Sequence, residues 1–202
     1  MSESRRRRRK DARPEEIIDA ALAEFAEMGF AGTSMGRIAA RAGIARPTVY
    51  LYFETKDAIF EAAVADRMGG TVARAQDILT RDIPFDTLFT QLLENYYTHV
   101  VGSDAPALFR VLIAEGRRFP GLVTLFSERM LGAIEDVLHK AIAHGIARGE
   151  VRPEVATLDL RVVFAPAVMA MIWGLIFDEV APLDRSRYMR SHLDIILRGL
   201  RV

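Results

Sequence analysis

The sequence has 202 residues, half of them apolar, which is enough for one good core or for a small domain beside a larger one. It contains no cysteine, so a disulfide framework, a thiol nucleophile and a cysteine-based zinc site are excluded. The N-terminus is charged without a following apolar stretch, and no apolar run is long enough to span a bilayer, which argues against secretion and membrane insertion. We therefore expect a globular protein of the cytoplasm with no membrane association.

Charge is unevenly distributed, although 27 basic and 27 acidic residues give a net charge of zero. The N-terminal segment carries Arg5 to Lys10 and Arg13 against only Glu3 and Asp11, so the rest of the chain is acidic overall. A short basic arm on an acidic body is typical of proteins that meet a polyanion at one end. The alternatives are a solvated tail without a partner and a localisation or heparin-binding patch. We expect residues 1–13 to form a basic, disordered arm.

The spacing of apolar residues follows the helical period in every long segment and the strand period in none, which predicts an all-α fold. Prolines and glycines mark most of the breaks, since proline suits the first turn of a helix and glycine the residue after its end. About nine helices are expected, over residues 14–29, 33–43, 45–51, from 56 onward, 85–101, 107–119, 120–148, 155–180 and 185–199. Short helices with tight turns give way to long ones near residue 60, where we place a domain boundary.

The two short helices joined by Ala42, Gly43 and Ile44 have the spacing of a helix-turn-helix, whose second helix lies in the major groove of DNA. Tyr50 and Tyr52 would point to opposite sides of a continuous helix, so the second helix is predicted to end between them, near residue 51. Tyr50 can then reach a phosphate through its hydroxyl, while Tyr52 contacts the DNA backbone or packs beside Phe53; the alternative is that both are core aromatics.

Residues 32–59, GTSMGRIAARAGIARPTVYLYFETKDAI, resemble the signature of the TetR family of transcriptional regulators. The matching features are a Thr-Ser cap, an Ile-Ala pair, an Ala-Gly turn, the Thr-Val-Tyr-x-Tyr-Phe run and a Lys-Asp pair. The resemblance implies a helix-turn-helix DNA-binding domain over residues 14–60 and a helical effector-binding and dimerisation domain over 61–202. It also implies a repressor that is released from a palindromic, double-stranded operator when a small molecule binds.

Several residues of the predicted DNA-binding domain over residues 14–60, called the head below, match positions through which the family contacts DNA. Arg46 is the best candidate for reading a base, because arginine pairs bidentately with guanine. Two positions depart from the usual pattern: Ala45 lacks the side chain of a capping serine, and Gly36 lowers helix propensity. The predicted DNA-binding residues are Thr33, Ser34, Arg46, Pro47, Thr48, Tyr50, Tyr52 and Lys56. Thr33 and Ser34 match a cap that contacts phosphate in the family, and the Lys56 ammonium and the backbone N–H groups near it can hold a phosphate.

The body is predicted to dimerise and to hold an effector of unknown identity. A single recognition helix reads few bases, so we expect a homodimer through the last two helices, which carry more apolar residues than one face needs. Aromatic and flexible apolar side chains of the middle helices predict a pocket, although such stripes are also typical of plain core. The candidate pocket residues are Phe89, Leu92, Leu93, Tyr96, His99, Phe109, Leu112, Phe126, Met130, Met169 and Trp173.

Two further features of the body leave alternatives open. Residues 107–126 resemble the body of an AefR-like subset of the family, which implies no particular effector. His99 and Arg110 lie in apolar helices and could hold a polar or anionic group of the effector; the alternatives are a paired core histidine and a solvated arginine.

Enzyme chemistry finds little support. The only close histidine pair, His139 and His144, is five residues apart and so does not share one helix face, as a zinc motif would require. No phosphate-binding glycine loop, nucleophile elbow or paired carboxylate is discernible. We expect no enzyme, no metal site and no cofactor; the alternatives to a regulator are a helical enzyme with a pocket and a scaffold protein with a basic arm.

Overall fold

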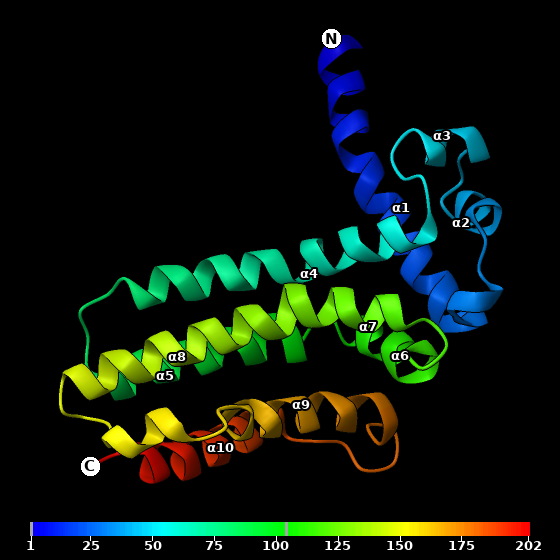
Figure 1. Cartoon of the computed structure of the whole chain (residues 1–202). Helices are drawn as coiled ribbons and strands as arrows, with labels where there is room; N and C mark the ends of the chain where they lie inside the picture. The colour runs from blue at the N-terminus through cyan, green and yellow to red at the C-terminus, as the bar shows by residue number, and fades with distance from the viewer. Residues whose placement is uncertain (1, 104) are drawn as a thin grey trace. The chain divides into compact units, whose positions relative to one another are not determined.

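The structure is a computed structural model of the chain that describes residues 2–103 and 105–202, with the backbone alone for residues 2–13. The described residues form helices and a single isolated bridge between Val151 and Arg201, with no strand, which confirms the all-α prediction (Figure 1). The α-helices are α1 (Ser2–Gly32), α2 (Met35–Arg41), α3 (Arg46–Tyr50), α4 (Lys56–Leu79), α5 (Phe85–Tyr96), α6 (Pro106–Glu115), α7 (Pro120–Phe126), α8 (Gly132–Ala147), α9 (Arg161–Ile176) and α10 (Arg185–Leu200).

Three shorter elements complete the described chain: the π-helical segments η1 (Tyr97–Val101) and η2 (Ser127–Leu131) and the 3-10 segment η3 (Pro153–Thr157). The segment η2 joins α7 to α8 without a break, so residues 120–147 form the one long helix that the sequence predicts. Counted in this way, the described α-helices make nine helical runs, as expected.

The chain folds as two compact units, and neither is a single segment. The first unit contains the residues up to Asp66 together with Ala107–Phe126, and the second contains Arg67–Pro106 and Ser127–Val202. Helix α4 therefore starts in the first unit and continues in the second. The boundary near residue 60, as a division between DNA-binding and effector-binding functions, stays a prediction.

The core of the first unit is built around Phe30, which is fully buried. Its ring packs on Phe25, Phe60 and Phe119, with ring centroids 4.9, 6.3 and 5.1 Å away, so α1, α4 and the segment before α7 share one aromatic cluster. The carboxylate of Glu115 accepts a hydrogen bond from the backbone N–H of Ala31 at 3.5 Å. These contacts explain why residues 107–126 belong to this unit.

The start of α1 differs from the prediction. The helix begins at Ser2 instead of Pro14, so the expected disordered arm over residues 1–13 is replaced by helical backbone in the described part. Arginine and lysine are good helix formers, which favours this continuation although Pro14 lies inside the helix. The side chains of the arm lie outside the described residues. At the other end, the helical path is interrupted at Gly29, whose φ of 70° is accessible without strain only to glycine.

The second unit is a bundle in which α5 packs against α8 and α10, and α9 packs against α10 (Figure 1). The buried residues of its core are Phe85, Phe89, Leu138, Ile142, Val151, Val155, Leu160, Val163, Leu197 and Leu200. Two expected helix limits are wrong. Helix α6 ends at Glu115 instead of 119, because the backbone N–H groups of Arg118 and Phe119 turn back onto the Glu115 carbonyl. Helix α9 begins only at Arg161, because η3 occupies residues 153–157 and Leu158 after it is extended.

None of the helices in the described ranges is long and apolar enough to cross a membrane.

Candidate DNA interface and ligand cavity

The turn between α2 and α3 is fixed by backbone geometry. The N–H of Gly43 donates to the carbonyl of Ala40 at 3.2 Å, and the N–H of Ile44 donates to that of Ala39 at 3.0 Å. This pair of bonds is the Schellman motif, and Gly43 takes the positive φ of 65° that the motif needs. Because the chain reverses within three residues, α3 is held at a defined angle to α2.

Helix α2 is capped as the sequence predicts. The side chain of Ser34 accepts a hydrogen bond from the Arg37 N–H at 3.3 Å, while Met35, Ile38 and Ala39 are buried beneath the helix. The Ser34 side chain is exposed, so its hydroxyl stays within reach of a ligand on this face.

Helix α3 buries Val49 and exposes its other face. Arg46, Pro47 and Tyr50 are exposed, and the guanidinium of Arg46 lies 5.6 Å from the centre of the Tyr50 ring with its Nη2 3.2 Å from the hydroxyl. Tyr50 is therefore not a core aromatic; the contact holds Arg46 in one orientation. The helix ends at Leu51, as predicted.

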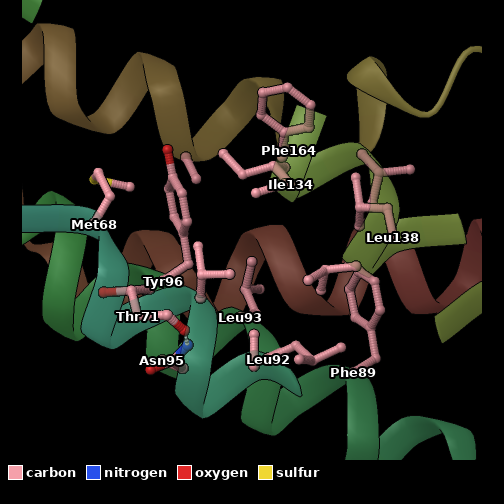
Figure 2. Close-up of a pocket in the computed structure, with 16 residues that line it drawn as sticks. Met68, Thr71, Phe89, Leu92, Leu93, Asn95, Tyr96, Ile134, Leu138 and Phe164 are labelled. Carbon is pink, nitrogen blue, oxygen red and sulfur yellow. Dashed lines mark hydrogen bonds between the residues drawn. The ribbon is translucent and has the colours of Figure 1, made fainter. Parts of the chain in front are cut away.

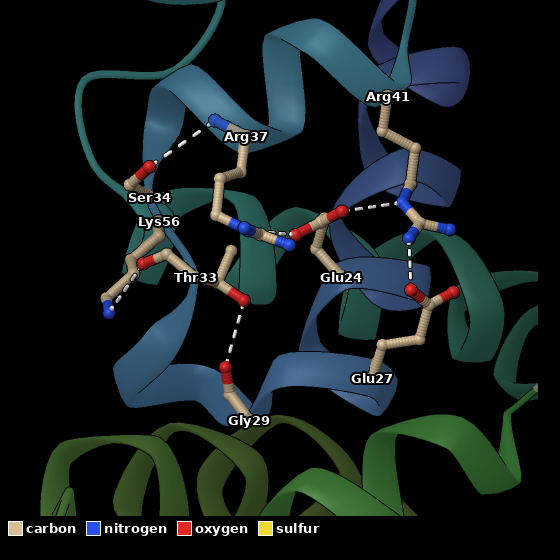
Figure 3. Close-up of polar contacts among 8 residues, drawn as sticks. All are labelled: Glu24, Glu27, Gly29, Thr33, Ser34, Arg37, Arg41 and Lys56. Carbon is tan, nitrogen blue, oxygen red and sulfur yellow. Dashed lines mark hydrogen bonds and ion pairs between the residues drawn. The ribbon is translucent and has the colours of Figure 1, made fainter.

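Two predicted phosphate contacts have other partners. Thr33 is only 3% exposed, and its hydroxyl donates to the Gly29 carbonyl at 2.9 Å, so it is not directed to solvent. The Lys56 ammonium donates to the Thr33 carbonyl at 3.2 Å (Figure 3). It also donates to the Phe30 carbonyl and lies 4.5 Å from the centre of the Phe30 ring. Both side chains thus fasten the connection between α1 and α2. The prediction missed these roles because the partners are backbone atoms brought close only by folding.

The N-terminus of α4 is also occupied. The Thr55 hydroxyl accepts the Ala58 N–H at 3.1 Å, which caps the helix at the place where backbone N–H groups were predicted to hold a phosphate.

A buried carboxylate joins α1 to α2, and it is not among the residues predicted from the sequence. Glu24 is 4% exposed and accepts from Nε of Arg37 and from Nε of Arg41, both at 2.7 Å (Figure 3). The hydrogen bond from Arg41, and then that from Arg37, lowers the pKa of Glu24. A signal was present: Glu24 lies three residues after Ala21 on the apolar face of α1, and Arg37 and Arg41 are four apart on α2.

The second unit contains an apolar cavity of about 70 Å³ between α4, α5, α8 and α9 (Figure 2). Helix α5 contributes four predicted residues, Phe89, Leu92, Leu93 and Tyr96. The prediction did not include Met68, Thr71, Val72 and Ala75 of α4, Asn95 of α5, Ala133, Ile134, Val137 and Leu138 of α8, or Val163, Phe164 and Ala167 of α9. No charged side chain is among the described residues that line it.

The other predicted pocket residues lie elsewhere. Phe109 and Phe126 pack edge to face at 4.8 Å in the first unit, which also contains Leu112. Met130 is buried outside the cavity, and Met169 is 50% exposed on the surface of α9. Trp173 packs on Phe177 and donates its indole N–H to the Ala181 carbonyl at 2.7 Å. The apolar pattern that predicts these residues reflects packing in the core or an apolar surface, and not the lining of a cavity.

Arg110 takes the solvated alternative, whereas His99 is not the paired core histidine of its alternative. Both are exposed, and His99 borders an open polar groove with Arg74 and Glu94. The paired core histidine is instead His192, whose Nδ1 lies 3.1 Å from the Tyr97 hydroxyl and whose Nε2 lies 2.9 Å from the Val163 carbonyl. The Tyr97 hydroxyl donates to Nδ1 of His192, and the Nε2–H of His192 donates to the Val163 carbonyl. These two bonds join η1, α10 and α9. Burial lowers the pKa of His192 and raises that of Tyr97.

Comparison with known proteins decides the family. Residues 17–63 match the family model described as bacterial regulatory proteins, tetR family, and residues 86–186 match the model described as tetracyclin repressor-like, C-terminal domain. The chain belongs to the TetR family. It is therefore a DNA-binding transcriptional regulator and not an enzyme. The model that matches the body does not carry the AefR-like description, so that finer resemblance stays an expectation.

Relatives that match most of the chain are regulators. The fatty acid metabolism regulator protein of Bacillus subtilis is 26% identical over 200 residues, covering 95% of this chain and 98% of that protein. The regulator SrpR of Pseudomonas putida is 25% identical over 173 residues, covering 84% and 76%.

Solved structures share the fold. The fatty acid degradation regulator FadR of Bacillus halodurans superposes with a TM-score of 0.73 at 22% identity, covering 93% of this chain and 96% of that one. FadR of Bacillus subtilis in complex with stearoyl-CoA gives a TM-score of 0.69 at 22% identity, covering 92% and 98%.

Proposed function

We propose that this TetR-family regulator is a cytoplasmic repressor that binds a palindromic operator as a homodimer and leaves it when the apolar chain of a small-molecule effector enters the cavity of the second unit. The carrying observation is the course of α4. The helix begins at Lys56, which is bonded to the α1–α2 connection, and later contributes Met68, Thr71 and Ala75 to the cavity wall. One helix therefore belongs to both sites.

On the operator, α3 is the reading element. Arg46 is exposed, and its stacking on Tyr50 limits the side-chain freedom that would be lost on binding. It reads a guanine, while Ser34, Pro47, Thr48, Tyr50 and Tyr52 position the head on the backbone. Thr33 and Lys56 support this surface from within.

The basic arm adds affinity that does not depend on sequence. Each phosphate neutralised by lysine or arginine steepens the salt dependence of binding. Deletion of residues 5–10 should therefore flatten the plot of log affinity against log salt, and an unchanged slope would exclude the arm from the DNA.

Dimerisation through α9 and α10 is supported by apolar side chains that the single chain leaves uncovered. Val162, Met169 and Ile176 are exposed and lie seven residues apart, so they form one stripe along α9, and Ile195 is exposed on α10. Other apolar residues of these two helices, Val163, Met171, Leu197 and Leu200, are buried within the chain. A two-fold dimer places two heads on half-sites about 34–36 Å apart.

The effector is proposed to be a long-chain fatty acyl thioester. Three facts support this class: the walls are apolar, a relative that covers 95% of this chain is the fatty acid metabolism regulator protein of Bacillus subtilis, and FadR of Bacillus subtilis was solved in complex with stearoyl-CoA. The cavity of about 70 Å³ is smaller than the roughly 150 Å³ cavity that binds benzene, so an acyl chain can enter only if the walls move. Displacement of α4 by the acyl chain is the step that moves the DNA-binding residues of the head.

The test combines DNase I footprinting with fluorescence anisotropy on the DNA upstream of the protein's own gene, at stated salt concentrations, with and without stearoyl-CoA. The wild type should give a defined footprint and lose it with the thioester. Arg46→Ala should lose the footprint, whereas Arg110→Ala, which removes another exposed arginine of the same unit, should keep it. Binding no tighter than to random DNA at every salt concentration would refute the repressor proposal.

A further inference from the structure

Tyr96 is placed to meet a ligand in the cavity. It follows Phe89 by seven residues and Leu92 by four on α5, so it lies on the same face of the helix as these two cavity-lining side chains. Its hydroxyl oxygen is buried and has no hydrogen-bond partner in the described chain. Burial raises the pKa of Tyr96 to about 12, so the hydroxyl keeps its proton at neutral pH and can donate it.

The other polar side chains of the cavity are already paired. Asn95 donates to the Thr71 carbonyl and accepts from Arg74 Nε, both at 2.9 Å, and Arg74 Nη2 donates to the Thr71 hydroxyl at 3.3 Å. Figure 2 shows the Tyr96 hydroxyl directed away from Thr71 and Asn95. The next residue, Tyr97, is also buried, but its hydroxyl donates to His192. Among the described polar side chains that line the cavity, Tyr96 is thus the one without a hydrogen-bond partner.

An unpaired buried hydroxyl lowers the stability of the free protein, so its retention calls for an explanation. A single water would satisfy the hydroxyl but would find few further partners on apolar walls. A ligand atom that accepts one hydrogen bond and is otherwise attached to hydrocarbon fits the site better.

We infer that the Tyr96 hydroxyl donates a hydrogen bond to the neutral carbonyl oxygen of the effector, the thioester carbonyl of an acyl chain that lies along the apolar walls. This inference rests on the proposed function and adds the recognition step. A free carboxylate is disfavoured, because the described lining offers no cationic side chain to balance its charge. The charged part of the thioester stays outside the cavity.

The experiment compares two probes that differ in this one oxygen. Stearoyl-CoA has the carbonyl, and S-octadecyl-CoA, a thioether, lacks it. Their affinities for the wild type and for Tyr96→Phe are measured by calorimetry below the concentrations at which they form micelles. The wild type should bind stearoyl-CoA about 3- to 10-fold more tightly, the range for one neutral hydrogen bond, and Tyr96→Phe should bind both probes equally. Tyr97→Phe, the matched control, should keep the preference.

The thermal midpoints of the free proteins give a second, independent readout. Tyr96→Phe removes an unpaired group and should leave the midpoint unchanged or raise it by about 2–4 °C, whereas Tyr97→Phe breaks a hydrogen bond and should lower it by a similar amount.

Equal binding of both probes by the wild type, or a preference that survives Tyr96→Phe, would overturn the inference and leave the proposed function standing. A lowered midpoint for Tyr96→Phe would show that the hydroxyl has a partner in the free protein and would also overturn it. Failure of stearoyl-CoA to bind at all would refute the effector class and the inference together.

Discussion

Replacing Lys56 by methionine separates a structural role from a phosphate contact. The change keeps the aliphatic stem and removes the ammonium that donates to the carbonyls of Phe30 and Thr33 and lies over the Phe30 ring. A hydrogen bond from a charged donor contributes about 1.5–3 kcal/mol, and a half-exposed cation–π contact adds about 0.5–1 kcal/mol. Water can replace part of this at the two carbonyls, so we expect a net loss of about 1–3 kcal/mol. The midpoint should then fall by roughly 2–4 °C for each kcal/mol.

The assay for Lys56→Met combines thermal unfolding, followed by circular dichroism, with the salt dependence of DNA binding. Lys140→Met is the control, because Lys140 pairs only with Asp136 on the surface of α8 and its loss should change stability by less than about 0.5 kcal/mol. If Lys56 is structural, the salt slope stays the same. An unchanged midpoint together with a slope reduced by about 0.9 for each lost phosphate contact would refute this reasoning and restore the phosphate role.

Three further changes are predicted. Gly36→Ala should stabilise the protein by up to about 1 kcal/mol in urea unfolding, because the added Cβ meets nothing closer than 3.8 Å, whereas Gly43→Ala should destabilise it by about 1–2 kcal/mol because of the positive φ. The buried, neutral His192 has a lowered pKa, so its contribution to stability is complete above pH ~6.5 and is lost as the pH falls below that value; His192→Gln, which can still accept and donate, should show a shallower acid slope in thermal unfolding from pH 7.5 to 5.5. Met169→Glu should dissociate the dimer in sedimentation velocity, and Ile113→Glu, the same change at an exposed apolar residue of the first unit, should not; a dimeric Met169→Glu variant would place the interface elsewhere.

Local signals explain what the sequence predicts well. The cap at Ser34, the positive φ at Gly43 and the end of α3 at Leu51 each depend on residues close in the chain, and all three are found where expected. The apolar face of α5 is equally local, since Phe89 and Tyr96 are seven residues apart. These features need no knowledge of the tertiary packing.

The side-chain roles that the sequence does not predict depend on distant parts of the chain. Lys56 and Thr33 are polar residues at positions typical of DNA contacts, and only folding brings the backbone carbonyls near them. Helix α9 is apolar on all sides, so its sequence does not say which residues face the cavity, the core or the surface. For this reason the sequence predicts Met169 and Trp173 as pocket residues, whereas Val163 and Phe164 are the ones that line the cavity.

Coupling between the operator and the effector is decided by one thermodynamic cycle. The affinity of the regulator for its upstream DNA is measured with and without saturating stearoyl-CoA, and the affinity for stearoyl-CoA is measured with and without saturating DNA. Because binding free energies are linked, each ligand must weaken the other by the same factor, which we expect to be about 5- to 150-fold. An affinity for DNA that saturating thioester leaves unchanged would contradict a ligand-released repressor.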